Sequence, residues 1–199
     1  MSGYVHPEFG YIDYRPADGE SRREKPRLLL HCCCAPCAAG AVERLVNVFE
    51  LTFYYYNPNI TEKEEYLKRF HELERLGEHF SVPVIDGGDG EDFFEAVEGS
   101  ENEPEGGKRC KVCFEMRLKK TAELAREYDY FATTLTLSPL KNARLINEIG
   151  ERAGEAAGSE YLKTDFKKRG GVLRSKALSE ELELYRQDYC GCVFSKRRL

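Results

Sequence analysis

The chain has 199 residues, of which 41% are hydrophobic and 33% are charged, a composition that fits one globular domain and excludes a disordered protein. No stretch has the roughly 18 uncharged apolar residues that a membrane span needs, and residues 1–20 lack a secretory pattern, so we expect a cytoplasmic protein without membrane contact. The net charge of −5 excludes a surface coated in positive charge for nucleic acid. Residues 163–199 nevertheless carry ten Lys and Arg against five Asp and Glu, which permits a local anionic partner.

The predicted elements alternate between strand and helix after an N-terminal tail, residues 1–26. Strands are predicted at 27–31, 50–56, 82–85, 130–134 and 160–163, and helices at 38–48, 62–80, 91–98, 110–128 and 139–157. Thr61 is the expected N-cap of the second helix, and Pro139 is expected to start the last one. This alternation predicts a single α/β domain over residues 27–199, with an open parallel sheet of about five strands and helices on both faces. The layout resembles the adenine-nucleotide hydrolases.

The unusual segments follow the predicted strands at their carboxyl ends, where open parallel sheets bind ligands. They are residues 32–37, 56–60, 133–139 and 165–168. No Gly-x-Gly-x-x-Gly or Walker sequence is present, which weakens a nucleotide-hydrolase interpretation. His31 is expected to be a hydrogen-bonded core histidine. For Asp165, a helix cap and an acid or metal-binding group remain open alternatives.

Eight cysteines in a cytoplasmic chain favour metal binding or redox chemistry over structural disulfides. Two Cys-x-x-Cys pairs, Cys34 with Cys37 and Cys110 with Cys113, could bring four sulfurs to one centre, either a structural zinc ion or an iron–sulfur cluster. Four further cysteines suggest a second ion or a redox pair. The sequence Cys190-Gly191-Cys192 suits a redox pair, because a bridge between residues two apart closes a strained ring that is easily reduced. Metal ligation or plain thiols remain open for these two.

Six segments together resemble the epoxyqueuosine reductases of the QueH type. They are residues 28–37 (LLLHCCCAPC), 56–60 (YNPNI) with Glu65, Tyr66 and Arg69, 109–118 (RCKVCFEMRL), 133–141 (TTLTLSPLK), 165–168 (DFKK) and 184–195 (LYRQDYCGCVFS). The combination spans nearly all of the chain after residue 26 and is far more specific than a single Cys-x-x-Cys. Cys32 stands where the family pattern has no cysteine.

The resemblance implies an oxidoreductase that removes the epoxide oxygen from epoxyqueuosine at the anticodon wobble position of tRNA, without cobalamin. It implies that Cys33, Cys34, Cys110 and Cys113 hold a [4Fe-4S] cluster and that Cys190 and Cys192 are a redox-active pair, on a C-terminal segment that closes the site. It further implies a neighbouring metal ion, expected to be iron, which we assign to Cys37 and Asp165. Asp165, or a water that it holds, is also the expected proton donor, and the electron donor is an unidentified partner.

A tRNA partner would also explain the basic C-terminal part of the chain. The candidates for backbone contacts are Lys167, Lys168, Arg169, Arg174, Lys176, Lys196, Arg197 and Arg198, although each could equally belong to a solvated surface. For the flipped-out modified base we expect Tyr56, Asn57 and Asn59, with Lys167, Lys168 and Arg186 as further substrate-binding residues. Two rival functions are a tRNA sulfur transferase with an iron–sulfur cluster, which would need ATP, and a zinc-stapled RNA-binding module without activity.

Overall fold

The computed structural model describes residues 5–6, 10–11, 25–88 and 92–196. Its centre is a four-stranded sheet with the order β5-β4-β3-β6, formed by β3 (Arg27–His31), β4 (Glu50–Tyr55), β5 (Val84–Asp86) and β6 (Tyr130–Thr133). All neighbouring strands are parallel. The carboxyl end of β3 lies between those of its neighbours, since His31 pairs with Tyr54 on one side and with Thr133 on the other. The predicted open parallel sheet is therefore confirmed.

The predicted fifth strand at residues 160–163 is wrong as a strand, because only one parallel bridge forms, between Phe131 and Tyr161. Three residues later, the Asn147 side chain hydrogen-bonds to both backbone groups of Thr164. Asn147 Nδ2 donates to the Thr164 carbonyl at 3.0 Å, and Asn147 Oδ1 accepts from the Thr164 N–H at 3.3 Å. A side chain from a neighbouring helix thus satisfies backbone groups that a longer strand would pair in its ladder.

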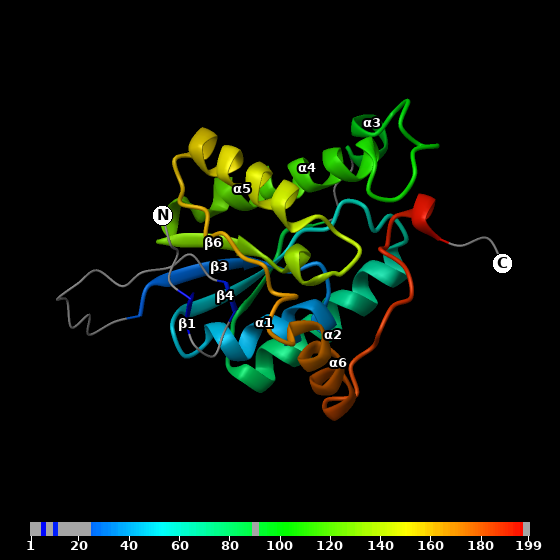
Figure 1. Ribbon diagram of the computed structural model, residues 1–199. Helices are drawn as coiled ribbons and strands as arrows, with labels where there is room; N and C mark the ends of the chain where they lie inside the picture. The colour runs from blue at the N-terminus through cyan, green and yellow to red at the C-terminus, as the bar shows by residue number, and fades with distance from the viewer. Residues whose placement is uncertain (1–4, 7–9, 12–24, 89–91, 197–199) are drawn as a thin grey trace.

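Helices cover both faces of the sheet, as expected from the alternating pattern (Figure 1). One face carries α1 (Ala35–Leu45), α2 (Lys63–Phe80) and α6 (Gly171–Glu181), and the other carries α4 (Lys108–Leu124) and α5 (Ala143–Ala157). Alternate residues of β3 point to opposite faces, so Leu28 and Leu30 join the core under α1 while Leu29 joins the core under α4 and α5. The short α3 (Phe93–Ala96) and three 3-10 turns, η1 (Ala125–Glu127), η2 (Thr134–Leu137) and η3 (Val193–Ser195), complete these elements.

Several helix boundaries differ from the expected ones for reasons visible in the caps. Asn142, not Pro139, starts α5, because Asn142 Oδ1 accepts a hydrogen bond from the Leu145 N–H at 3.2 Å. Helix α2 begins after Glu62 without a side-chain cap, so Thr61 is not its N-cap. Helix α6 has no counterpart in the predicted elements. Its buried face includes Ser175, whose hydroxyl donates to the Pro36 carbonyl at 2.6 Å. Because small polar residues occupy that face, the sequence lacks the helical spacing of apolar residues that would have predicted it.

The N-terminal part contributes a short antiparallel pair, β1 (Val5–His6) with β2 (Gly10–Tyr11). The remainder of residues 1–24 lies outside the described residues, and so do Arg197 and Arg198. Within the described ranges, none of the helices combines the length and the apolarity that crossing a bilayer requires.

Candidate functional site

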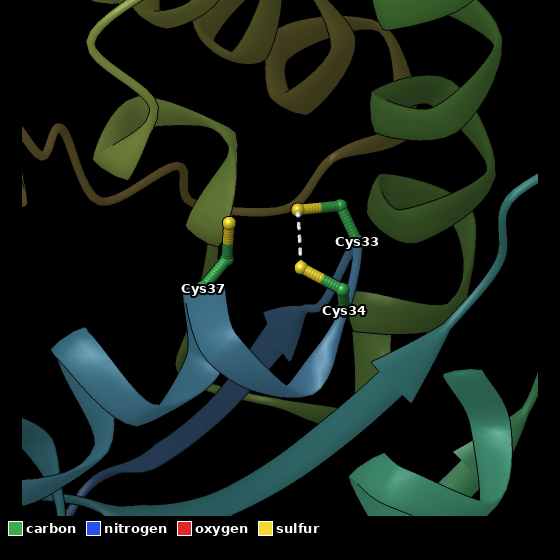
Figure 2. A group of neighbouring side chains, drawn as sticks. All are labelled: Cys33, Cys34 and Cys37. Atoms are coloured by element: carbon green, nitrogen blue, oxygen red, sulfur yellow. Dashed lines mark hydrogen bonds between the residues drawn. The ribbon is translucent and has the colours of Figure 1, made fainter. Parts of the chain in front are cut away.

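Three sulfur atoms meet where β3 ends and α1 begins. The Sγ atoms of Cys33, Cys34 and Cys37 all lie within 4.8 Å of one another, and those of Cys33 and Cys34 are 3.9 Å apart (Figure 2). Cys34 is the N-cap of α1 and Cys37 lies in its first turn, so the start of the helix turns both sulfurs toward the strand end. Thiolates at about 2.3 Å from a tetrahedral metal ion are about 3.8 Å apart, which matches this spacing. The group could therefore hold a metal ion.

The three thiols share protons unequally. Hydrogen bonds with Cys34 and Cys37, helped by the charge of Lys141, outweigh burial and hold the pKa of Cys33 well below its ordinary value. The same hydrogen bond raises the pKa of Cys34 to about 12, and hydrogen bonding to Cys33 raises the pKa of Cys37 well above its ordinary value. Cys33 is therefore the thiolate, and Cys34 and Cys37 are the thiols that stabilise it. Binding of a metal cation to all three sulfurs would release the protons of the two thiols.

A second group of sulfurs lies on α4 and on the C-terminal segment. Cys110, Cys113, Cys190 and Cys192 line a cavity of about 100 Å³. Cys113 packs with Cys192, Phe93 and Val97, and burial raises its pKa to about 12. All eight cysteines of the chain are within the described residues and all are free, so Cys190 and Cys192 are not bonded to each other.

A larger cavity of about 230 Å³ brings the two sulfur groups together, since Cys33, Cys37 and Cys190 all line it. The two cavities share the lining residues Glu105, Arg117, Leu140, Lys141, Cys190 and Ser195. The residues of the three cysteine motifs thus surround adjoining space at the carboxyl end of the sheet, the edge at which the sequence predicts the site.

The C-terminal segment, residues 182–196, reaches these cavities by docking on α2. Arg69 is 2% exposed and donates to the carbonyls of Cys190 at 3.2 Å and Tyr189 at 3.3 Å, while its Nε pairs with Glu65 at 2.6 Å. Asn59 Nδ2 also donates to the Cys190 carbonyl, at 3.4 Å. Gly191 has a φ of 101°, and a Cβ there would lie 2.7 Å from Ile60 Cγ1, so only glycine fits this contact.

Two buried groups lie beneath the sulfur atoms. His31 is fully buried, and its Nε2 donates to the Tyr56 carbonyl at 3.0 Å, so its Nδ1 accepts from the Thr133 hydroxyl at 2.9 Å. Burial, followed by the charge of Arg117, lowers the pKa of His31 to about 4 and keeps the ring neutral. The expectation of a hydrogen-bonded core histidine is confirmed. Cys32 is fully buried as well, and its thiol donates to the Leu30 carbonyl at 3.3 Å, away from the group of three.

The two asparagines predicted to contact the substrate are buried and hydrogen-bond to the backbone next to the cysteines. Asn57 is fully buried and its Nδ2 donates to the Cys32 carbonyl at 3.0 Å, whereas Asn59 is 1% exposed and holds Cys190. Tyr56 is half-buried and stacks on Tyr54 with ring centroids 6.3 Å apart. The contacts of both asparagines are those of positioning residues.

Asp165 lines neither cavity and is not one of the three clustered ligands. Its carboxylate lies 3.5 Å from the ammonium groups of both Lys167 and Lys168. Lys167 in turn donates to the carbonyl of Lys141, a cavity residue, at 3.1 Å. Asp165 is therefore connected to the cavity wall through Lys167, while Arg186 is exposed and lines neither cavity.

Sequence reasoning assigned no role to three cations that the structure places at the site, Arg69, Arg117 and Lys141. All three are within the motif segments, but a charged residue on a helix or in a loop ordinarily faces solvent. Spacing could have found Arg117, since it follows Cys113 by four residues and Cys110 by seven and so shares their helix face.

The fold and the site define an α/β protein with cysteine groups gathered at the carboxyl end of a parallel sheet. The family model described as "Epoxyqueuosine reductase QueH" matches residues 28–198. The Epoxyqueuosine reductase QueH of Streptococcus pyogenes serotype M1 is 40% identical over 190 residues, which cover 89% of this chain and 73% of that protein. The protein of that name from Staphylococcus epidermidis is 43% identical over 183 residues, covering 86% and 77%, and the one from Thermotoga maritima is 37% identical over 174 residues, covering 84% and 89%.

The chain therefore belongs to the epoxyqueuosine reductase QueH family, and it is an oxidoreductase. Among solved structures, the U34-tRNA thiolase NcsA from Methanococcus maripaludis with its [4Fe-4S] cluster is 14% identical, with a TM-score of 0.49 over 88% of this chain and 63% of that chain. So distant a likeness carries no argument about this chain.

Proposed function

We propose that this chain reduces epoxyqueuosine in the anticodon wobble position of tRNA to queuosine, without cobalamin. The reaction takes two electrons and two protons, and the epoxide oxygen leaves as water while the alkene forms. The observation that carries the proposal is the family match over residues 28–198, together with the convergence of all three cysteine motifs on adjoining cavities. Residues 27–199 would act as one cytoplasmic catalytic domain.

Cys33, Cys34, Cys110 and Cys113 are the proposed ligands of a [4Fe-4S] cluster. The donor set fits such a group, because thiolates are its ordinary ligands and the buried Arg117 hydrogen-bonds to Cys113 Sγ at 3.1 Å. Cys37 and Asp165 are the proposed ligands of a second metal ion, expected to be iron. Cys37 lies beside two of the proposed cluster ligands, and Asp165 Oδ1 is buried without a hydrogen bond, with the Lys167 ammonium 3.5 Å away. When bound, the cluster would supply single electrons and the ion would act as a Lewis acid toward the epoxide oxygen.

Cys190 and Cys192 are the proposed redox pair. Two thiols that form a disulfide release two electrons and two protons, which is what the removal of one epoxide oxygen as water requires. Cys190 lines both cavities, each of which is also lined by one of the other cysteine motifs, and this supports the proposed role. An external electron donor would then reduce the disulfide back to two thiols. Asp165, or a water that it holds, is the proposed proton donor to the substrate.

The tRNA would bind on the side of the cavities where Lys167 and Lys168 lie, with Tyr56 and Arg186 as further contacts. Lys167 supports this orientation, because it hydrogen-bonds to the backbone of the cavity residue Lys141. We assign Asn57 and Asn59 to the same substrate site, where they would act by holding the backbone at Cys32 and at Cys190.

The test combines metal analysis with a tRNA assay on protein purified without oxygen. We expect iron and acid-labile sulfide with more than four irons per chain, and conversion of epoxyqueuosine-containing tRNA to queuosine-containing tRNA with a chemical reductant and no cobalamin. Stoichiometric zinc without sulfide would overturn the proposal in favour of a structural module. Incorporation of sulfur into tRNA that depends on ATP would identify a sulfur transferase instead.

A further inference from the structure

Arg117 on α4 is a buried cation without an acidic partner. The side chain is 1% exposed, and no carboxylate among the described residues lies within ion-pair distance of it. A guanidinium does not lose its proton in a protein, so the charge persists at this depth. Because burying an unpaired charge is strongly unfavourable, some anionic group must balance it.

The contacts of Arg117 show where that anion belongs. Nε donates to the Cys113 carbonyl at 3.1 Å and Nη2 donates to Cys113 Sγ, while Nη1 reaches Asn57 Oδ1 at 3.5 Å. Asn57 is itself fixed by its bond to the Cys32 carbonyl, which turns its oxygen toward Arg117. The guanidinium thus bridges the sulfur-bearing helix and the ends of β3 and β4, and it lines both cavities.

The walls that both cavities share carry a net positive charge, opposite in sign to that of the cluster. Four thiolates and a core of charge +2 sum to −2, whereas Arg117 and Lys141 supply +2 and Glu105 supplies −1 in those walls. Adding one electron makes the centre −3, which a fixed neighbouring cation favours. Net charge and hydrogen bonds to the sulfurs are the terms by which a protein sets the potential of such a cluster.

We propose that Arg117 is the fixed counter-charge of the iron–sulfur centre, orienting its Cys113 ligand and favouring its one-electron reduction. Arg117 is a positioning residue, since it acts through Cys113, to which both Nε and Nη2 donate. The step that it favours moves one electron from the donor to the cluster core, and no bond breaks and no proton moves. The proposal rests on the cofactor proposed above.

The experiment is a redox titration of anaerobically reconstituted protein, followed by electron paramagnetic resonance of the reduced cluster. Arg117→Met removes the charge at similar volume, and Arg117→Lys keeps it. Lys119→Met removes an exposed charge from the same helix and serves as the matched control. At a fixed potential, we expect the ratio of reduced to oxidised cluster in Arg117→Met to fall at least tenfold, which is about 59 mV for a one-electron couple. Arg117→Lys should fall by less, and Lys119→Met should match the wild type.

An Arg117→Met protein with full iron and sulfide and an unchanged ratio would overturn this proposal and leave the proposed function intact. A wild-type protein without iron and sulfide would overturn the proposed cofactor, and this inference with it. If Arg117→Met does not load while Arg117→Lys loads, the charge is needed for the cluster and the inference stands. If neither variant loads although both keep the wild-type far-ultraviolet circular dichroism, shape rather than charge is needed, and the inference fails.

Discussion

The two regions that bring cysteines to the cavities are built in different ways. Cys33 and Cys34 follow a central strand paired on both sides, and Cys37 lies in the first turn of the helix that comes next. Cys190 and Cys192 lie on residues 182–196, which contribute no strand and are held by side chains of α2 and the loop before it. The geometry of the first region therefore comes from the sheet itself. That of the second depends on a few polar contacts, so the two can be perturbed separately.

The largest expected effect comes from a cysteine of the first region. Cys33→Ser should lose its iron, and its reductase activity should fall by at least about 100-fold, since a thiolate ligand is lost from the proposed centre. Cys190→Ser should lose activity comparably but keep its iron, because the proposed cluster ligands remain. Iron analysis and single-turnover assays of both variants check this. Equal iron loss in the two proteins would show that the regions do not have separate roles.

Arg69→Met should release the second region without disturbing the first. Arg69 is a buried cation that holds two carbonyls of the segment and pairs with Glu65, so we expect the free energy of unfolding to fall by about 3 kcal/mol. In metal-free protein, alkylation of Cys190 should become at least about tenfold faster. A tenfold rise in the population of the open segment requires its opening free energy to fall by only about 1.4 kcal/mol. Denaturant titration and mass spectrometry of the alkylated thiols are the measurements.

The control for this variant is Arg75→Met on the same helix. Arg75 also reaches the segment, at the Leu182 carbonyl, but its side chain is 51% exposed, and its ion pair with Glu72 is therefore open to solvent on the arginine side. Its removal should cost less than about 1 kcal/mol. If alkylation of Cys190 rises equally in the two variants, Arg69 has no special part in holding the segment.

The same contrast explains what could be predicted from the sequence. The first region is local: a buried strand, a cysteine run and a helix start follow one another, so the position of Cys33, Cys34 and Cys37 at the strand end could be predicted. The parallel sheet, the helices on both faces and the family could be predicted for the same reason, because they follow from alternating patterns and motif spacing.

The second region could not be predicted, because its contacts join residues far apart in the chain. The bonds from Arg69 to Tyr189 and Cys190 span 120 and 121 positions, and nothing in the pattern of either segment encodes them. Helix α6 was not predicted, because serines rather than apolar residues occupy part of its buried face. The burial of Asn57 and Asn59 likewise depends on which distant carbonyls they meet.

Gly191→Ala should loosen the second region by a smaller amount. Its φ of 101° and the close approach of Ile60 and Arg69 both oppose a side chain, so we expect a loss of about 2 kcal/mol and faster alkylation of Cys190. Gly158→Ala is the matched control, because that residue also has a positive φ, 73°, but nothing lies within 4 Å of its Cβ position. It should cost about 1 kcal/mol and leave Cys190 unchanged. Faster alkylation in the control would mean that global unfolding, not the segment, exposes the thiol.

The smallest expected effect lies on the outer side of the first region, where Arg174 of α6 pairs with Glu43 of α1 at 2.6 Å. Both side chains are more than a third exposed, so Arg174→Gln should cost at most about 1 kcal/mol at neutral pH and leave the iron content unchanged. The pH dependence of this effect follows from the carboxyl group, because the hydrogen bond from Arg174 lowers the pKa of Glu43.

A carboxylate with a lowered pKa stabilises the folded state above its unfolded pKa of about 4.3, and this contribution disappears as the pH falls through the folded pKa. The difference between the denaturation midpoints of wild type and variant should therefore be present at pH 7 and shrink as the pH falls below about 4.3. A difference that stays constant over this range would show that packing of the Arg174 stem against α1, rather than its charge, joins the two helices.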